Sequence, residues 1–218
     1  MDCGYLLQNN FPVAEKLTAY GFTQQGDGWH LERTLPFNNL VMVVDLIPPQ
    51  FIVRVIDQTF NDDFLPFEIK GGTSPIKAAV DELLNDMVAT CFTNPKRELI
   101  AHCENTYHTL VEQPWEKFPE YYTFKTAKRQ KWYAVILRIP CQKIGFTGTG
   151  QIDIVNVKLP PEQIPTLIDG RHYFASYHMD KRYWLTIVLN QDTDWPQVKR
   201  LLDQSYQLVE NAPKGKTK

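Results

Sequence analysis

Residues 172–209 read HYFASYHMDKRYWLTIVLNQDTDWPQVKRLLDQSYQLV, and they carry the strongest structural signal in the chain. Apolar residues alternate with other residues on both sides of a turn at 179–182, and this period of two predicts an antiparallel β-hairpin. After Asn190 the apolar residues fall instead on one face of a helix, formed by Val198, Leu201, Leu202, Leu208 and Val209. Pro196 fits the first turn of that helix, where its missing N–H has no partner to lose.

The residues before this stretch extend the same unit. Asn94-Pro95 opens a helix whose apolar face continues to Val111, and Gln113-Pro114 ends it. Strands are predicted at 121–125, 132–139 and 152–158, and a short helix follows Pro160-Pro161. With the hairpin and the last helix, the order is α-β-β-β-α-β-β-α. We therefore predict an α+β unit in which helices pack on one face of an antiparallel sheet.

The first 93 residues predict a separate, smaller unit with the order α-β-β-β-α. A helix runs from Phe11-Pro12 to Tyr20, and Gly21 fits the left-handed position after its end. Ser74 and Pro75 fit the cap and first residue of a second helix, which extends to Cys91. The strands between them are expected at 29–34, 40–46 and 51–56, with a short edge strand at 64–69 and Gly71-Gly72 ending the β region. The predicted domains are thus 1–93, 94–213 and a disordered basic tail at 214–218.

Charge is unevenly distributed along the chain. The formal net charge is −2, but residues 1–93 hold 5 basic and 12 acidic residues, a balance of −7, whereas residues 94–218 hold 18 and 13, a balance of +5. Such asymmetry indicates two units that attract each other or have different partners. No stretch is apolar and long enough to span a bilayer, and the N-terminus has no secretory signal. The four scattered cysteines have no ligand spacing, so we expect reduced thiols in a cytoplasmic protein.

The motif HMDKRYW, followed by LLDQSYQLV, resembles the C-terminal signature of the MmcQ/YjbR family. NPKRELIAHC is similar to the opening helix of that family, FKTAKRQKWYAVIL to its first hairpin, and VNVKLPPEQIPTLID to its third strand and middle helix. The resemblance extends over residues 94–213 and implies a fold similar to the CyaY-like, or frataxin, arrangement. The corresponding hairpins of the family have been likened to the wings of a winged DNA-binding fold, so the resemblance also implies DNA binding. The chain departs from the family at Tyr183, where many members have a second histidine.

Two basic turns beside aromatic residues are the best functional signal. Lysine and arginine neutralise phosphates, and an aromatic plane can stack on a base. His178, which matches the first histidine of the family motif, is expected to fix its turn by a hydrogen bond beside Asp180. The alternative is that strand-end tryptophans face the core and that basic turns keep a sheet edge soluble. The candidate nucleic-acid-binding residues are Lys128, Arg129, Lys131, Trp132, His178, Lys181, Arg182 and Trp184.

The sequence predicts no catalytic residues, no metal site and no cofactor. GFTGTG, residues 145–150, lacks the Lys-Ser/Thr of a phosphate-binding loop and is predicted to be a plain hairpin loop. The five histidines have no metal-ligand spacing. A frataxin-like metal-handling role needs an acidic ridge, whereas the first helix of the second unit mixes glutamates with Lys96 and Arg97.

These observations predict a non-enzymatic, cytoplasmic nucleic-acid-binding or regulatory protein with no membrane association. A different hypothesis is a protein-interaction module without a nucleic-acid role. In that case the acidic first unit covers the basic surface of the second unit by an intramolecular contact, or binds another partner.

Overall fold

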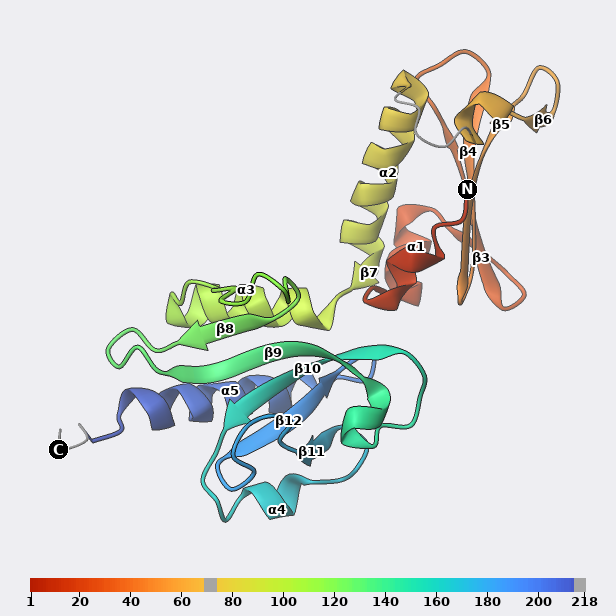
Figure 1. The fold of residues 1–218 in the computed structure, drawn as a ribbon. Coiled ribbons are helices and arrows are strands. Elements are labelled where there is room, and N and C mark those ends of the chain that lie inside the picture. The colour runs from red at the N-terminus through yellow and green to blue at the C-terminus, as the bar shows by residue number, and fades with distance from the viewer. Residues whose placement is uncertain (69–73, 214–218) are drawn as a thin grey trace. The chain divides into compact units, whose positions relative to one another are not determined.

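The computed structural model describes residues 1–68 and 74–213, and the chain divides into two compact units, Met1–Asn94 and Pro95–Lys218 (Figure 1). The predicted basic tail at 214–218 and the Gly71-Gly72 pair lie outside the described residues. Within those residues, no helix has both the length and the apolar character needed to cross a membrane.

A five-stranded antiparallel sheet organises the first unit. Its strands run in the order β2 (Thr23–Gln25), β3 (Gly28–Thr34), β4 (Leu40–Ile47), β5 (Gln50–Asp57) and β6 (Asp62–Asp63). Helices α1 (Ala14–Tyr20) and α2 (Pro75–Cys91) cover one face of this sheet (Figure 1). Every second residue of β4 and β5 points toward the helices, because side chains alternate along a strand. The resulting core contains Leu17, Met42, Val44, Val53, Val80, Leu84 and Met87.

The helix boundaries of this unit follow from its capping residues. The Ser74 hydroxyl accepts a hydrogen bond from the Lys77 N–H at 3.1 Å, and Pro75 begins α2, as predicted. Gly21 ends α1 with φ +109°, a left-handed conformation that favours glycine.

Two predictions in the first unit are wrong in detail. Phe11–Pro12 does not open the helix but forms the short strand β1, which pairs with β7 (Phe92–Thr93). The predicted edge strand at 64–69 is instead a 3₁₀ helix, η2 (Leu65–Glu68), and the edge strand β6 lies just before it; Ile69 is outside the described residues. Pro66 explains the second difference, since proline has no N–H for a ladder bond. A further 3₁₀ helix, η1 (Gly4–Gln8), precedes β1.

The second unit is built on another five-stranded antiparallel sheet, with the order β11-β12-β10-β9-β8. The strands are β8 (Tyr122–Lys125), β9 (Trp132–Pro140), β10 (Gln151–Lys158), β11 (Tyr173–Ala175) and β12 (Trp184–Leu189). Helices α3 (Pro95–Tyr107) and α5 (Trp195–Glu210) pack on one face (Figure 1). The 3₁₀ helix η3 (Cys141–Ile144) and the short α4 (Ile164–Leu167) lie in the connections. The predicted α+β fold with an antiparallel sheet and flanking helices is confirmed.

The first helix of this unit is shorter than predicted. α3 ends at Tyr107, and His108 has a positive φ of +49°. The apolar spacing up to Val111 is not due to a longer helix, because this segment is extended. At its end the backbones of Glu112 and Thr123 exchange hydrogen bonds at 3.2 and 2.9 Å. Leu110, predicted on the buried face, is 84% exposed. On α5, Leu208 is likewise 38% exposed.

The hairpin at residues 172–190 is also more open than predicted. β11 ends at Ala175 and β12 begins at Trp184, so an irregular loop from Ser176 to Tyr183 replaces the tight turn. Ala175 and Leu185 are the last paired residues. His172 and His178 therefore do not share a strand.

Candidate nucleic-acid interface

The two basic turns lie at the same end of the second sheet (Figure 1). One is the β8–β9 turn, residues 126–131, and the other is the loop before β12, residues 176–183. β10 runs between β9 and β12, and its last residues pair with the first residues of both, as Val157 with Ala134 and Lys158 with Trp184. Because neighbouring strands are about 4.8 Å apart, the two turns begin roughly 10 Å from each other.

The predicted cations at this end differ in their availability. Lys128, Lys131 and Lys181 are exposed and form no ion pair within the described part of the chain. Arg129 is already engaged, because its guanidinium donates to the carbonyls of Glu210 and Ala212 at the end of α5. We call the three exposed side chains, Lys128, Lys131 and Lys181, the lysine triad.

Arg182 is paired with Asp180, whose carboxylate lies 2.9 Å from the guanidinium. This pairing lowers the pKa of Asp180 and raises that of Arg182, so both groups stay charged and the carboxylate offsets the charge of the guanidinium. Both side chains of the pair are exposed, so water and salt screen their attraction. A phosphate can therefore compete with Asp180 for the guanidinium.

The two predicted tryptophans occupy different environments. Trp184 is only 8% exposed at the start of β12, so it supports the sheet and has little surface for a ligand. Trp132 is half-buried at the start of β9 and lines a pocket on the sheet face opposite α3 and α5.

That pocket is formed mainly by aromatic side chains and has a volume of about 320 Å³. Trp115 lies edge-on to Trp132, with ring centroids 5.8 Å apart, and also edge-on to Tyr121 at 6.1 Å. Phe118 stacks on Tyr121 at 4.8 Å and is itself 50% exposed. Burial and the nearby Tyr177 raise the pKa of Tyr121, which keeps its hydroxyl neutral. The full lining, which we call the aromatic pocket, is Trp115, Phe118, Tyr121, Trp132, Val135, Leu137, His178 and Met179.

His178 and Met179 reach the aromatic pocket from the loop before β12, and buried polar groups position that loop. Asn156 donates to the Tyr177 carbonyl at 2.9 Å, and the Tyr177 N–H donates to the Thr186 hydroxyl at 3.0 Å. The Thr186 hydroxyl in turn donates to the Asn156 side-chain oxygen, which closes the ring of hydrogen bonds. Asn156 and Thr186 are fully buried, so these bonds are shielded from water.

The predicted role of His178 in fixing its turn is not what the structure shows. No hydrogen bond of His178 is found among the described residues; it has φ +60° and its ring lies 4.0 Å from that of Tyr177. Asp180 fixes the turn instead, because its carboxylate accepts hydrogen bonds from the Arg182 backbone and guanidinium. His178 is therefore an exposed pocket residue.

Of the four Trp, Phe and Tyr side chains that line the aromatic pocket, the sequence interpretation identified only Trp132 and missed Trp115, Phe118 and Tyr121. They follow α3 in an irregular segment. Its residues have neither the helical nor the strand spacing that would show which side chains point to the same side. Their only signal was the density of aromatic residues between Trp115 and Tyr122.

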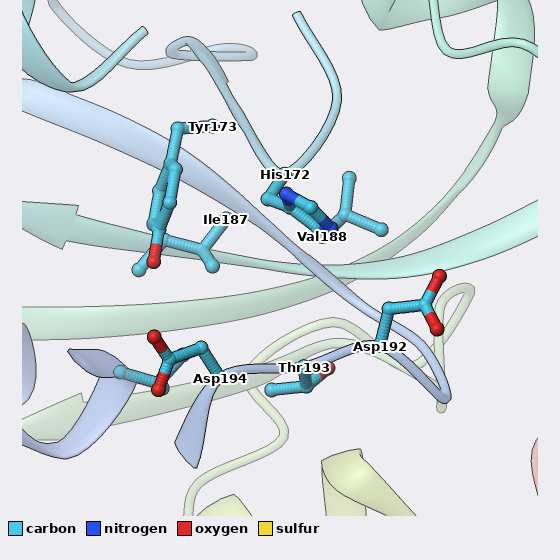
Figure 2. A pocket seen from close by; sticks show the side chains of 8 residues that line it. His172, Tyr173, Ile187, Val188, Asp192, Thr193 and Asp194 are labelled. Carbon is cyan, nitrogen blue, oxygen red and sulfur yellow. The ribbon is translucent and has the colours of Figure 1, made fainter. Parts of the chain in front are cut away.

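A second, smaller pocket of about 150 Å³ lies beside the start of α5 (Figure 2). Figure 2 shows His172 and Tyr173 facing the segment that carries Asp192, Thr193 and Asp194. Its polar groups already have partners, since Asp194 caps α5 by accepting from the Gln197 N–H and Asp192 pairs with Arg171 at 3.8 Å. This pocket is therefore explained by the fold of the helix start.

Comparisons with known proteins agree with this architecture. The family model described as YjbR matches residues 105–208, inside the second unit. An uncharacterized protein of Bacillus subtilis, YyaQ, is 35% identical over 114 residues, which is 52% of this chain and 97% of that protein. A crystal structure of a Pseudomonas syringae protein is 33% identical, with a TM-score of 0.51, and the match covers 52% of this chain and 97% of that chain. Through its second unit, the chain belongs to the YjbR family.

Proposed function

We propose that this protein is a non-enzymatic nucleic-acid-binding protein and that the phosphates of its ligand contact the lysine triad. The observation that carries this proposal is the convergence of two hairpin ends: three exposed lysines from two turns lie at one end of one sheet, and none has an ion pair with any residue in 1–68 or 74–213. Cations arranged in this way neutralise successive phosphates and release their counterions.

Arg182 is assigned a second, conditional contact. Its bond to Asp180 is exposed, so phosphate replaces the carboxylate when the ligand arrives. Arg129 and Trp184 are assigned structural roles, the first in holding the end of α5 and the second in supporting β12. The proposed contact set is thereby smaller than the set identified from the sequence.

The proposal includes no catalytic step. In the aromatic pocket, the polar side-chain groups are the His178 imidazole, the Tyr121 hydroxyl and two indole N–H groups. This set lacks a nucleophile hydrogen-bonded to a base, which acyl or phosphoryl transfer through a covalent intermediate requires.

The test replaces the lysine triad together, as Lys128→Ala, Lys131→Ala and Lys181→Ala, in the full chain. Binding to a fluorescent single strand and to a duplex is followed by anisotropy across a salt series. We expect weaker binding and a salt slope reduced by about 0.7 per lost phosphate contact on the single strand and about 0.9 on the duplex.

The matched control removes three other exposed cations, Lys143, Lys199 and Arg200, and so changes the net charge equally. These residues lie after β9 or on α5, away from the lysine triad. If the control lowers affinity and slope as much as the triad variant, the binding is nonspecific and the assigned contacts are wrong. If neither DNA form binds at low salt, the nucleic-acid proposal fails.

A protein-interaction module is the second candidate, and the charge split favours it. The −7 balance of residues 1–93 and the +5 balance of residues 94–218 make the units electrostatically complementary. In this proposal the protein has no nucleic-acid role, and the acidic first unit covers the basic surface of the second unit or binds another partner.

A further inference from the structure

The aromatic pocket shares two loops with the lysine triad, yet phosphate binding does not use it. Trp132 directly follows Lys131, and Met179 precedes Lys181 by two residues. Residues of one loop so close in sequence lie within about 7 Å along the backbone, which a lysine side chain spans. A ligand in the pocket therefore extends toward two exposed cations.

We propose that the aromatic pocket accepts one unpaired nucleobase of a single-stranded nucleic acid, a proposal that rests on the nucleic-acid function given above. The phosphates flanking this base contact Lys131 on one side and Lys181 on the other. The protein thus selects single strands, or duplexes with an extruded base, over paired duplex.

The shape of the pocket favours a flat ring. Its aromatic walls meet edge-on, with interplanar angles of 60° between Trp115 and Trp132 and 82° between Trp115 and Tyr121. Steeply inclined walls of this kind contact a planar guest on its face and on its edge. At about 320 Å³ the pocket is at the small end of the range of roughly 300–1,000 Å³ for ligand sites.

The chemistry of the pocket favours a base over an apolar side chain. Within the residues that the structure describes, neither the Trp115 nor the Trp132 indole N–H forms a hydrogen bond, so both are available as donors. His178 adds an exposed imidazole at the rim. A nucleobase offers ring nitrogens and carbonyl oxygens for these groups, whereas an aliphatic or phenyl side chain offers none.

The surrounding charge directs the strand toward the lysine triad. The pocket lining contains no carboxylate. The nearest acidic residues in sequence are Asp180, which pairs with Arg182 at 2.9 Å, Glu116, which is exposed beside Trp115, and Glu120, which is held by Lys96 at 2.8 Å. Phosphates are therefore repelled from the Glu116 side and attracted to the Lys131 and Lys181 side.

Single-strand selection follows from access. In a duplex the base faces are stacked and the Watson–Crick edges are paired, so a base reaches a protein pocket only after it is unstacked and flipped out. An unpaired strand meets no such cost, and each base stacked on an aromatic side chain contributes to affinity without regard to sequence.

The test uses the full chain with an oligothymidylate, an oligoadenylate RNA and a mixed duplex of equal length. Binding is measured by anisotropy and by intrinsic tryptophan fluorescence, since Trp115 and Trp132 line the pocket. We expect both single strands to bind about tenfold more tightly than the duplex and to quench the fluorescence. A response to only one of the two single strands still supports the pocket and shows a preference for the base and sugar of that strand taken together.

The pocket variants are Phe118→Ala and Trp115→Ala, with Trp115→Phe as the conservative change. Loss of one stacking ring is expected to lower single-strand affinity about tenfold, and Trp115→Phe restores most of it. The salt slope stays unchanged, because no cation is removed. Phe60→Ala, which removes an aromatic side chain that is 79% exposed in the first unit, is the matched control and leaves affinity unchanged.

The outcomes separate this inference from the function on which it rests. Equal affinity for duplex and single strand, with no effect of the pocket variants, overturns the base-binding pocket but leaves phosphate binding by the lysine triad intact. Absence of binding to all three nucleic acids overturns both. Phe118 is half-exposed, so we expect the Phe118→Ala variant to remain folded. The test is therefore decisive even if Trp115→Ala unfolds the protein.

Discussion

Ser205 connects three elements of the second unit through one hydroxyl. It lies on the buried face of α5, donates to the Tyr133 carbonyl of β9 at 2.6 Å, and accepts from the Lys158 N–H of β10 at 2.7 Å. The next residue, Tyr206, stacks on Tyr107 of α3 with ring centroids 4.5 Å apart. Ser205 and Tyr206 thus hold the closing helix α5 against the sheet and against the opening helix α3.

Replacing Ser205 with Ala is expected to destabilise the second unit by about 1–3 kcal/mol, because two buried backbone groups lose their partner. Urea unfolding followed by circular dichroism gives the free energy change. Lys199→Ala, at an exposed position of the same helix, is the control and should change it by less than about 0.5 kcal/mol. Equal effects of the two substitutions would contradict the role assigned to the hydroxyl.

Asp169 orders the turn that leads into β11. One of its carboxylate oxygens accepts backbone hydrogen bonds from Arg171, His172 and Tyr173 at 2.8–2.9 Å. Partial burial raises its pKa, but the three N–H groups and His172 outweigh that effect and lower the pKa to about 2. The carboxylate is therefore more acidic in the folded chain than in the unfolded chain.

A lowered folded-state pKa stabilises the protein above the unfolded value of about 3.9, and that stabilisation is lost as pH falls toward 2. We expect the wild type to be more stable than Asp169→Asn near neutral pH, and the gap to narrow below about pH 4. Unfolding free energies of the two proteins, measured from neutral to acidic pH, test this. A gap that stays constant through acidic pH would show that the charge of Asp169 is not responsible.

Among the secondary-structure elements, the loop before β12 is held in place by the buried ring of hydrogen bonds between Asn156, Tyr177 and Thr186. Thr186→Val keeps the shape of the side chain but removes its hydroxyl, which leaves the Tyr177 N–H and the Asn156 side-chain oxygen unpaired. We expect a loss of about 1–3 kcal/mol of unfolding free energy. Hydrogen exchange should speed up at residues 176–183, since Tyr177 anchors this loop to the sheet.

Thr193→Val provides the comparison for this substitution, because among the described residues the Thr193 hydroxyl bonds only to the neighbouring Asn190 backbone. Its effect on exchange should be confined to the start of α5. Faster exchange at 176–183 in both variants would mean that the loop is not anchored by Thr186.

Local signals allowed most elements to be predicted from the sequence. α2 and α5 have a polar cap, an early proline and a continuous apolar face, and both begin where these features place them. β4, β5, β9 and β10 are runs of β-branched residues with clear ends. The end of α3 was not predictable in this way, because Val111 packs on the same core from an extended segment and continues the helical spacing.

The candidate interface was predictable only where it coincided with a hairpin end. The sequence alone shows charged residues beside an aromatic residue at a turn, and this pattern identified Lys128, Lys131, Lys181 and Trp132. Whether Arg129 and Arg182 have partners depends on the end of α5 and on Asp180, and their availability emerges only in three dimensions. Trp115 and Phe118 line the pocket from an irregular segment, in which apolar residues follow neither helical nor strand spacing.

At the scale of the whole molecule, the two units have separate hydrophobic cores. One contains residues of α1, α2 and the first sheet, and the others contain only residues of the second unit. We therefore expect a fragment of residues 95–218 to fold alone and to unfold cooperatively, as measured by urea titration. A fragment without a cooperative transition would show that the second unit requires the first.

This fragment also tests masking by the acidic unit. If residues 1–94 compete with nucleic acid for the lysine triad, the folded fragment binds a single strand more tightly than the full chain at low salt, and the difference shrinks as salt screens the charges. Equal affinity at every salt concentration would rule masking out.

The four cysteines make it possible to follow the unfolding of each unit separately by chemical labelling. Cys3 and Cys91 lie in Met1–Asn94, Cys103 and Cys141 lie in Pro95–Lys218, and all four are buried and free. Burial raises the pKa of Cys91 to about 11 and that of Cys103 to about 12, so the reactive thiolate is scarce while the protein is folded. An alkylating reagent therefore marks each unit when it opens, and the mass of the peptide that carries the adduct records which unit opened first.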